Sequence, residues 1–430
     1  MLSMSPAHVY VTTDALKSPS GAATVRRICE AISSAEPEIV TEEQLAQIVP
    51  ERDWGRFPAW GMVPPQERRD PELVLTTGKF GLSPEQMKKR AEALPQLRVN
   101  DLLGHDFFWF RPDGEPWWRK QRGGVICQSA YQLHSITGCP FRCDYCGMGN
   151  VIRMLVNVDE YVEQLDGWMD IAGEQRLFKW DNRSDVSCFE PEYGLSARLV
   201  DFFARKPDRY LEIYIGKSDN CEHLLNLDHR GKTILQWSIG PHTQCEQMEE
   251  RTASMDQRIE AGRRCREAGY IVRYRFSPLV PVRNWREECS DLIEKLCTRA
   301  QPDIISLCAF GWMSHDAARQ RMKMDLFDPQ FVAAMEAVAP FIGERDVRCG
   351  AQTIPFEARY VMFQHCLQEI RRVRPETHVA LCLEPGEMWA AFHGRLRGGP
   401  EGYVCNCGGH CAPGNPMYDA AVSTVFRPVT

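Results

Sequence analysis

The sequence of 430 residues lacks any run of about eighteen consecutive apolar residues, which excludes a membrane-spanning helix. Its first residues, MLSMSPAHVYVTTDAL, lack the basic stretch followed by an apolar stretch that marks a secretory signal. No internal repeat and no low-complexity tract stands out. We therefore expect a soluble, cytoplasmic protein with one large core or a core with added subdomains.

An excess of basic residues is also missing. The chain has 58 acidic and 51 basic residues, for a formal net charge of -7, and its Lys and Arg residues form only short clusters. A surface that binds duplex DNA usually shows a basic excess or a basic stripe. The balance argues against a nucleic-acid partner and fits a neutral or cationic small molecule at least as well.

Cysteine, in contrast, is abundant, with 18 residues. Nothing in the sequence suggests an oxidising compartment, so we do not expect a disulfide framework. Most cysteines, such as Cys29, Cys265 and Cys366, fall inside apolar helical patterns and are expected to be small buried residues. Two groups of cysteines are tightly spaced, and these groups carry the chemical argument.

From Gly124 onward, short apolar runs alternate with amphipathic stretches. Strands that alternate with helices predict βαβ units and a parallel sheet. The expected fold is α/β, a partial (β/α)6 barrel over residues 121–315, with ligands at the C-terminal ends of its strands. The strand runs are 132–135, 177–180, 212–215, 234–239, 271–276 and 304–310, and the helical stretches are 158–169, 196–203, 255–267 and 285–297.

Two further regions are expected to flank this barrel. Residues 1–120 are predicted to form a small α/β unit and a Pro- and Trp-rich wrap, from 54 to 118, across the main domain. Residues 316–430 are predicted to form a C-terminal extension. It contains a long helix pattern over 356–371, a strand-like stretch over 378–383 and a tail rich in Gly, Pro and Cys.

The first cysteine group lies in TGCPFRCDYCGMGN, residues 137–150, directly after a predicted strand. Cys139, Cys143 and Cys146 can each hold one iron of a [4Fe–4S] cluster and leave the fourth iron open. S-adenosylmethionine can chelate that open iron, and one electron then releases a 5′-deoxyadenosyl radical. A zinc knuckle is the alternative, but zinc sites usually close with a fourth Cys or His, which the loop lacks. The loop therefore predicts a radical S-adenosylmethionine enzyme.

Beyond this loop, the chain resembles the spore photoproduct lyase family of radical S-adenosylmethionine enzymes. The resemblance begins at Val9-Tyr10, is closest across residues 222–225, 231–233, 237–239 and 249–252, and fades after about residue 315. It implies a shared fold, but a shared fold does not fix the reaction.

The resemblance also implies which residues bind the cofactor. Lys217 and Ser238 match family positions that contact S-adenosylmethionine, and Ser184 and Asp185 match a pair near its methionine portion. Tyr145 matches a tyrosine on the cofactor side. Lys217 is the strongest of these candidates because a cation there can pair with the methionine carboxylate.

Two positions depart from the family pattern. The family carries a cysteine hydrogen-atom donor just before its Ser-Asp pair, where this sequence has Asn182, and a relay tyrosine after the third cluster cysteine, where it has Gly147. An amide cannot donate a hydrogen atom as a thiol can. Cys188 comes into register only if the Ser-Asp match is given up. DNA repair of thymine lesions is therefore kept as the alternative function.

The leading interpretation is radical dehydration of a 1,2-diol, because a substrate radical that eliminates water does not need the missing relay. In overall character the chain resembles the diol dehydratases of aminoglycoside antibiotic biosynthesis. This resemblance implies a cationic amino sugar as the substrate. The expected partners are a flavodoxin or ferredoxin as electron donor and a nicotinamide-dependent reductase in the pathway. A third interpretation is a non-catalytic iron–sulfur or zinc protein.

Dehydration requires a general base, a proton donor and anions that hold ammonium groups. Asp181, Asn182 and Asp185 are the candidate catalytic residues, and Asp181 is the strongest carboxylate because it follows an apolar strand. Glu190 and Asp219 are better explained as loop acids or helix caps. His134, on an earlier strand, is expected to be a packed strand histidine.

Arg273 and Arg275 alternate on one predicted strand and so share a face. If that face lines the barrel, Arg275 is a candidate to bind the methionine carboxylate or a substrate oxyanion. If it faces outward, both arginines are salt-bridging surface residues, and we weigh the two placements equally.

The second cysteine group is Cys405, Cys407 and Cys411, in a Gly-rich tail. Close thiols beside His410 predict an auxiliary iron–sulfur cluster or a zinc site. The alternative is a lid that covers the barrel mouth while its thiols stay free.

Overall fold

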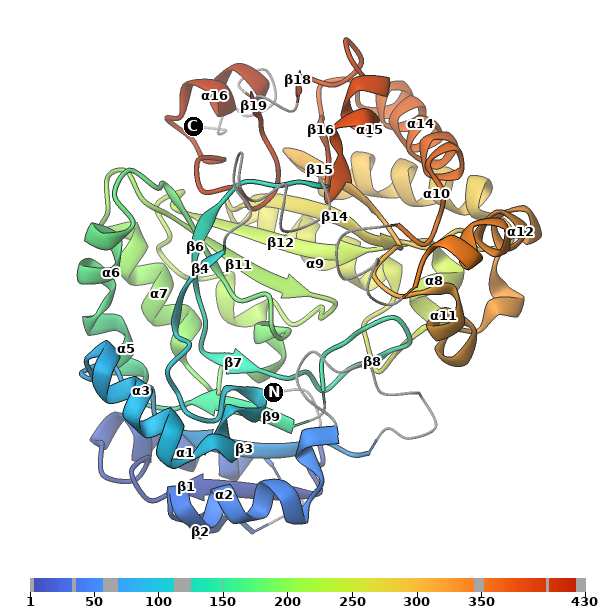
Figure 1. Ribbon diagram of the computed structural model, residues 1–430. Helices are drawn as coiled ribbons and strands as arrows, with labels where there is room; N and C mark the ends of the chain where they lie inside the picture. The colour runs from blue at the N-terminus through green and yellow to red at the C-terminus, as the bar shows by residue number, and fades with distance from the viewer. Residues whose placement is uncertain are drawn as a thin grey trace.

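The computed structural model of the protein describes residues 4–32, 36–56, 69–111, 125–149, 151–343, 352–399 and 402–422. Most of these residues belong to two sheets and the helices around them (Figure 1). Within these ranges, no helix has both the length and the apolar character that crossing a bilayer requires.

The larger sheet has eight strands in the order β16-β15-β14-β12-β11-β10-β6-β4. Seven of them are parallel, and β4 runs antiparallel to β6 at one edge. The strands are β4 (Phe108–Arg111), β6 (Ala130–Leu133), β10 (Leu177–Trp180), β11 (Tyr210–Gly216), β12 (Thr233–Ile239), β14 (Ile271–Leu279), β15 (Ile304–Ala309) and β16 (His378–Leu381).

All six predicted strand runs lie in this sheet, which confirms the α/β class. They were recognisable because strands covered on both faces are nearly continuous apolar runs. The sheet is wider than the six strands expected, because β16 adds a seventh parallel strand beside β15 and β4 adds an antiparallel edge. Residues from the stretch 316–430 therefore extend the same sheet.

Helices connect and cover these strands (Figure 1). The predicted helix over 255–267 is α9, and its start is fixed by a capping box between Ser254 and Gln257. The predicted helix over 158–169 is divided in two at Gln164. The helices after β9 are α5 (Val158–Glu163), α6 (Leu165–Ile171), α7 (Leu195–Ala204), α8 (His242–Gln247), α9 (Met255–Glu267), α10 (Trp285–Lys295), α11 (His315–Arg321), α12 (Pro329–Val338), α14 (Phe356–Val373), α15 (Gly386–Ala391) and α16 (Pro416–Val422).

The smaller sheet has the order β2-β1-β3-β9-β7, with β7 antiparallel to β9 and the other pairs parallel. Its β9 and β7 come from beyond residue 120, so the N-terminal unit is continuous with the central region. The Pro- and Trp-rich wrap expected over 54–118 lies outside the described residues at 57–68 and from 112 onward. The elements are β1 (His8–Thr12), α1 (Pro19–Ala31), β2 (Glu38–Val40), α2 (Glu42–Glu51), β3 (Glu72–Thr76), α3 (Pro84–Ala93), β7 (Ile136–Thr137) and β9 (Val151–Leu155).

One face of the larger sheet is unusually polar. Because side chains alternate along a strand, neighbours in register project from the same face. Lys179 lies beside Glu212, and Gln236 lies beside Arg273, and all four are buried. Buried polar side chains need partners or a ligand, so this face is where a site is expected.

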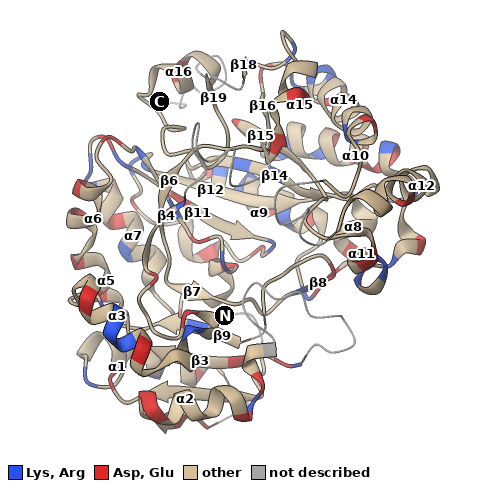
Figure 2. Cartoon of the chain, in the orientation of Figure 1, with Lys and Arg blue, Asp and Glu red and all other residues tan. Residues whose placement is uncertain are grey.

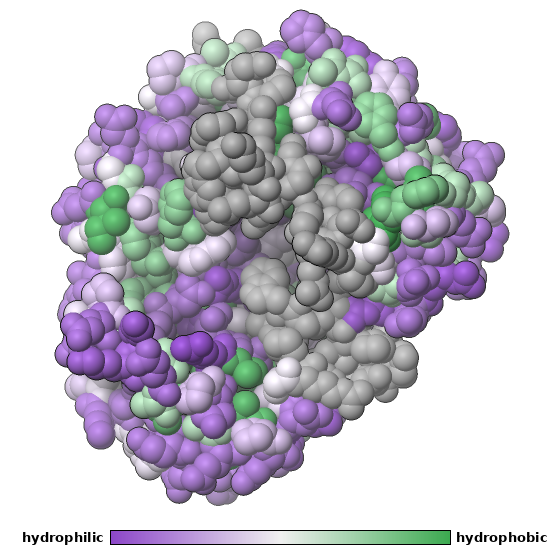
Figure 3. All heavy atoms as spheres, viewed as in Figure 1, coloured by the Kyte–Doolittle hydropathy of each residue, from purple (hydrophilic) through white to green (hydrophobic). Residues whose placement is uncertain are grey.

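Charged residues of both signs are spread along the described helices in the view of Figure 2. Lys and Arg alternate with Asp and Glu over the helices (Figure 2). Hydrophilic residues cover most of the described part of the face shown in Figure 3.

Candidate active site

The three-cysteine loop leaves β7 and returns to β9. Its middle forms the short strand β8 (Arg142–Cys143), which pairs antiparallel with β13 (Glu249–Glu250). At its start, Gly138 has a φ of 94°, and a Cβ there would lie 2.2 Å from the carbonyl oxygen of Val151. Only glycine fits such a close approach with a positive φ. The loop is thus held against both β9 and the segment after β12.

The three thiols fit a metal cluster. Cys143 is buried, and Cys139 and Cys146 are half-buried. Burial raises the pKa of Cys139 and of Cys143, and the neighbouring cluster cysteines raise both further. The backbone N–H of Met148 points to Cys146 Sγ at 3.4 Å. Thiols crowded together out of water need a bound cation to ionise, and a [4Fe–4S] cluster supplies one.

The geometry differs from that of a single-ion site. Among the described residues, no three His, Cys, Asp or Glu side chains converge on one point as the ligands of one metal ion do. In a cubane, each iron takes its own thiolate, so the sulfur atoms lie further apart.

Lys217 follows β11, and a buried carboxylate, Glu249, connects it to the three-cysteine loop. Its Nζ lies 3.3 Å from Glu249 and 5.5 Å from the centre of the Tyr145 ring. The sequence predicted a methionine carboxylate as its partner, and the structure shows Glu249 in contact with it. Lys217 Nζ makes no hydrogen bond within the described chain, so its ammonium can still donate to a ligand.

Glu249 is the centre of this network. Arg258 lies 2.6 Å from it, Gln244 donates to it at 2.9 Å, and the hydroxyl of Tyr145 donates to it as well. Burial opposes ionisation of Glu249, yet Arg258 and Lys217 outweigh burial and lower its pKa to about 2. Tyr145, predicted on the cofactor side, lies in the cluster loop itself, and Glu249 fixes the position of its hydroxyl. The sequence analysis missed Glu249, although it lies within the closest part of the family resemblance.

Asp185 and Ser184 lie at the end of β10, close to Lys217. Asp185 accepts the backbone N–H groups of Lys217 at 2.5 Å and Ser218 at 2.8 Å. Burial raises the pKa of Asp185 to about 6 even though these hydrogen bonds lower it. The Ser184 hydroxyl is buried and has no hydrogen-bond partner among the described residues. The structure thus brings together the Ser-Asp pair and Lys217, as the family resemblance implied.

Ser238 and Asn182 are two further candidates at this end of the sheet. The hydroxyl of Ser238 lies 2.7 Å from that of Tyr214, and Tyr214 lies under the ammonium of Lys179 at 4.4 Å. Asn182 is half-buried directly after Asp181.

Asp181 belongs to a pair that the sequence did not reveal. One of its oxygens lies 2.6 Å from Nδ1 of His134, and the other accepts the backbone N–H of Ser135 at 3.0 Å. Both side chains of the pair are fully buried, and hydrogen bonds and His134 lower the pKa of Asp181 although burial opposes this. The free atom of the pair is Nε2 of His134, which has no partner in the described chain. Sequence spacing could not show this, because it depends on β6 lying beside β10.

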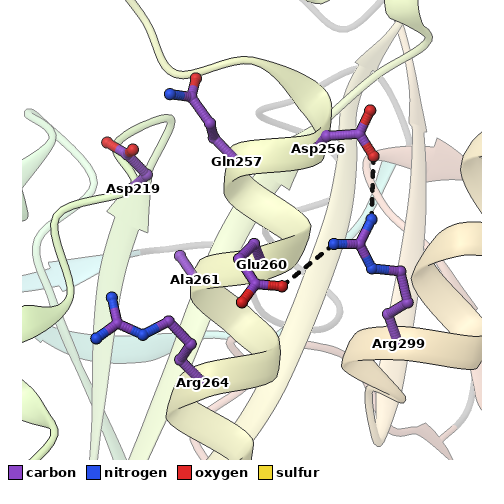
Figure 4. A pocket seen from close by; sticks show the side chains of 7 residues that line it. All are labelled: Asp219, Asp256, Gln257, Glu260, Ala261, Arg264 and Arg299. Atoms are coloured by element: carbon purple, nitrogen blue, oxygen red, sulfur yellow. Dashed lines mark hydrogen bonds and ion pairs between the residues drawn. The ribbon is translucent and has the colours of Figure 1, made fainter.

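The structure also shows where the two carboxylates lie that the sequence analysis explained as loop acids or helix caps. Glu190 accepts the backbone N–H groups of Gly194 and Ser196, both at 2.8 Å, and so caps the start of α7. Asp219 is exposed and lines a surface hollow of about 320 Å³ beside α9 (Figure 4). In that hollow Arg299 pairs with Asp256 and Glu260, each at 3.2 Å. Because Arg299 is already paired with these carboxylates, we assign the hollow no chemistry.

Arg273 and Arg275 do share a face, and the face is the buried polar one. Arg273 pairs with Asp303 at 3.2 Å and donates to the backbone oxygen of Asn406 at 2.7 Å. The alternative prediction, that Arg273 and Arg275 lie on an exposed surface, is therefore wrong. Arg275 contacts two thiols, Cys382 at 2.9 Å and Cys308 at 3.9 Å.

The C-terminal tail lies at the opposite ends of the strands. The backbone oxygen of Gly409 accepts the N–H groups of Arg176 and Leu177, where β10 begins, and Val404 accepts from His378, where β16 begins. The alternative prediction, that the tail forms a lid over the mouth of the barrel, is therefore wrong. These hydrogen bonds hold the tail at the N-terminal ends of the strands.

Within the tail, the three cysteines are buried together. Cys405 Sγ and Cys411 Sγ lie 4.0 Å apart, and Arg111 lies 3.5 Å from Cys407 Sγ. An auxiliary cluster or a zinc ion at these thiols stays a prediction.

The chain is similar in sequence to one family of known proteins. The model of the spore photoproduct lyase family matches residues 127–325. Spore photoproduct lyase of Bacillus subtilis (strain 168) is 29% identical over 192 residues, and that of Geobacillus sp. (strain Y412MC61) is 25% identical over 192 residues. Each alignment covers 43% of this chain and 56% of the relative, so the chain matches little more than half the length of these relatives.

Solved structures extend the likeness in fold. A mutant spore photoproduct lyase with bound AdoMet and dinucleoside spore photoproduct has a TM-score of 0.55 at 16% identity, over 88% of this chain and 98% of that chain. Another mutant of the enzyme has a TM-score of 0.59 at the same identity and coverage. Taken together, these findings show that the chain is similar to spore photoproduct lyases, in sequence over residues 127–325 and in fold over most of its length.

Proposed function

We propose that the protein is a radical S-adenosylmethionine enzyme of the lyase type. The observation that carries this proposal is the group of three crowded thiols, Cys139, Cys143 and Cys146, beside the ammonium of Lys217. When bound there, a [4Fe–4S] cluster and S-adenosylmethionine supply a 5′-deoxyadenosyl radical. We also propose that β6, β10, β11, β12, β14 and β15 form the partial (β/α)6 barrel around this site, with the Cys-rich tail as an extension.

The chain's own residues then bind and orient the cofactor. Lys217 can donate to the methionine carboxylate, because one carboxylate at 3.3 Å leaves its ammonium with donors to spare. Ser184 offers a buried hydroxyl without a partner, and Ser238 lies two strands away on the same polar face. Glu249, which is paired with Arg258, holds the side chains of Lys217 and Tyr145 in place. A ligand therefore meets groups that are already oriented.

The comparisons favour a thymine photoproduct in DNA as the substrate, since the relatives named above are spore photoproduct lyases and one solved structure carries a dinucleoside spore photoproduct. The net charge of -7 had argued against DNA, but a lesion of two nucleotides requires only a local site.

Radical dehydration of a small polar diol is the second candidate. Asn182 and Gly147, which replace the family's hydrogen-atom donor and relay tyrosine, favour it. For this reaction, His134 is the residue placed to move a proton, because Asp181 holds its Nδ1 and leaves Nε2 free. An amino sugar remains the proposed substrate class for this candidate.

Cofactor cleavage tests the proposal. Protein reconstituted without oxygen, then reduced and given S-adenosylmethionine, is expected to form 5′-deoxyadenosine and methionine. The variant Cys146→Ala should form neither, whereas Cys29→Ala, a half-buried thiol on α1, should match the wild type. If the wild type forms no 5′-deoxyadenosine, the enzyme is not of this class.

A thymine-lesion dinucleotide and a paromamine-type pseudodisaccharide, offered in parallel, separate the two substrates. Turnover of the dinucleotide alone supports the repair reaction and refutes dehydration. Asn182→Cys should leave cofactor cleavage intact, because Asn182 is assigned no contact with the cofactor. Loss of 5′-deoxyadenosine in that variant would show that this placement is wrong.

A further inference from the structure

Two cysteines lie side by side at the ends of neighbouring strands. Leu307 of β15 is in register with Leu381 of β16, so Cys308 and Cys382 follow at adjacent positions. Arg275 Nη2 lies 2.9 Å from Cys382 Sγ and 3.9 Å from Cys308 Sγ. A guanidinium shared by two thiols is a feature that neither packing nor the cofactor site described above explains.

Arg275 lies close to both sulfur atoms and favours one thiolate within the pair. The neighbouring Cys382 and the charge of Arg275 lower the pKa of Cys308 to about 6, although burial opposes this. The neighbouring Cys308 and burial raise the pKa of Cys382. The chain offers a contrast in Cys289 and Cys366, which form a buried pair on helices α10 and α14. There the neighbouring thiol and burial raise the pKa of Cys289, and its listed charged neighbour is the carboxylate of Glu288.

The pair faces the candidate active site. Arg275 is the register neighbour of Ser238, whose hydroxyl lies 2.7 Å from that of Tyr214. These groups lie on the polar face of the sheet, toward the strand ends that also carry Lys217. Arg275 and Cys382 are half-buried, so part of each side chain remains accessible.

We propose that Cys308 and Cys382 are a redox-active pair that returns a hydrogen atom to the substrate radical, the role that Asn182 cannot fill. The proposal rests on the proposed radical chemistry but not on either substrate. It applies to any reaction of this site that ends in a carbon-centred radical.

The step balances as follows. The carbon radical takes the hydrogen atom of the Cys382 S–H, so a C–H bond forms and a thiyl radical remains on Cys382. The thiyl joins the Cys308 thiolate in a disulfide radical anion, whose negative charge stays beside Arg275. One electron from a reduced flavodoxin- or ferredoxin-class protein and one proton then break the S–S bond and restore the thiol and the thiolate.

Thiol chemistry tests the pair without any substrate. In reconstituted protein at pH 7, mild oxidation with diamide should form a Cys308–Cys382 disulfide on the order of tenfold faster in the wild type than in Arg275→Gln, since the thiolate that Arg275 stabilises is the attacking group. Peptide mapping should find this disulfide before any Cys289–Cys366 disulfide. A link from Cys127 to Cys382 instead, or equal rates of disulfide formation in both proteins, would overturn the proposal.

Turnover in D2O tests the hydrogen return. With the thymine-lesion dinucleotide and the paromamine-type pseudodisaccharide as probes, the product of the wild type should carry deuterium from the exchangeable thiol. Cys382→Ala should still form 5′-deoxyadenosine but lose the deuterated product, whereas Cys366→Ala should keep both. Unchanged labelled product in Cys382→Ala would refute the pair. Absence of 5′-deoxyadenosine in the wild type would refute the proposed function instead, and the thiol experiments would still decide on the pair.

Discussion

The two three-cysteine segments of this chain look alike as sequence and differ as structure. The loop with Cys139, Cys143 and Cys146 lies at the C-terminal ends of the strands, beside Lys217 Nζ and Ser184 Oγ, which make no hydrogen bond among the described residues. The tail with Cys405, Cys407 and Cys411 lies at the N-terminal ends, and hydrogen bonds tie its backbone to β10 and β16. The two segments therefore differ in place: the loop borders the candidate cofactor site, whereas hydrogen bonds anchor the tail at the other ends of the strands.

The strongest test of this difference removes one thiol from each segment. Cys143→Ala should abolish iron–sulfur absorption of the cofactor site and all formation of 5′-deoxyadenosine, because that iron loses its ligand. Cys407→Ala should retain cofactor cleavage. Anaerobic absorption spectra and product analysis measure both. If Cys407→Ala abolishes cleavage as completely as Cys143→Ala does, the two segments do not differ as we describe.

The next effect concerns the ammonium beside the loop. Lys217→Met should weaken S-adenosylmethionine binding about tenfold to hundredfold, the usual effect of losing a hydrogen bond to a charged group. Calorimetry on the reconstituted protein measures the dissociation constant. Lys206→Met, which removes a surface lysine paired with Asp166, is the matched control and should not change it. Equal affinities in all three proteins would remove Lys217 from the cofactor site.

A variant of the tail should change stability instead of binding. The amide of Asn406 donates to the backbone oxygen of Tyr274 at 3.0 Å and accepts from Ser306 at 2.5 Å, and all three are buried. Asn406→Ala should lower the free energy of unfolding by about 1–3 kcal/mol, because buried partners lose their hydrogen bonds. Urea unfolding gives this value. Unchanged stability would contradict the anchoring role, and weaker binding of S-adenosylmethionine would place the tail in the site.

The smallest expected effect is a dependence of stability on pH, which comes from Asp185 beside the three-cysteine loop. The pKa of Asp185 is about 6 in the fold and 3.8 in model compounds. As the pH rises, the carboxyl group therefore ionises at a lower pH in the unfolded chain than in the folded protein. The stability contributed by the neutral carboxyl is complete below pH 3.8 and is lost as the pH rises toward 6. The total is about 3 kcal/mol, of which about 1 kcal/mol is lost between pH 5 and 7.

Asp185→Asn should remove this dependence, as measured by urea unfolding at several pH values. Asp201→Asn, at an exposed residue paired with Arg205, is the control and should keep the slope of the wild type. The same slope in Asp185→Asn would show that another group titrates.

Local patterns in the sequence predicted the elements and one part of the site. Apolar runs located six strands of the large sheet, the spacing of thiols located the loop, and family resemblance brought Ser184, Asp185 and Lys217 to one place. These features depend on short segments and on their order along the chain.

Pairs formed between strands could not be predicted in the same way. His134 meets Asp181, and Arg275 meets Cys308 and Cys382, only because particular strands are neighbours in a particular register. The strand-like stretch over 378–383 was visible, but its place beside β15 was not. The position of the tail required long-range hydrogen bonds for which spacing gives no signal.

The hydrogen bonds between the tail and β10 also bear on how the chain matures. Arg176 donates to Pro413, a residue 237 positions later in the chain. While the protein is being synthesised, the first residues of β10 therefore remain without these partners until almost the whole polypeptide has left the ribosome. Nascent chains interrupted before residue 402 are expected to expose the first residues of β10 and to depend on chaperones, whereas point variants within the tail are not.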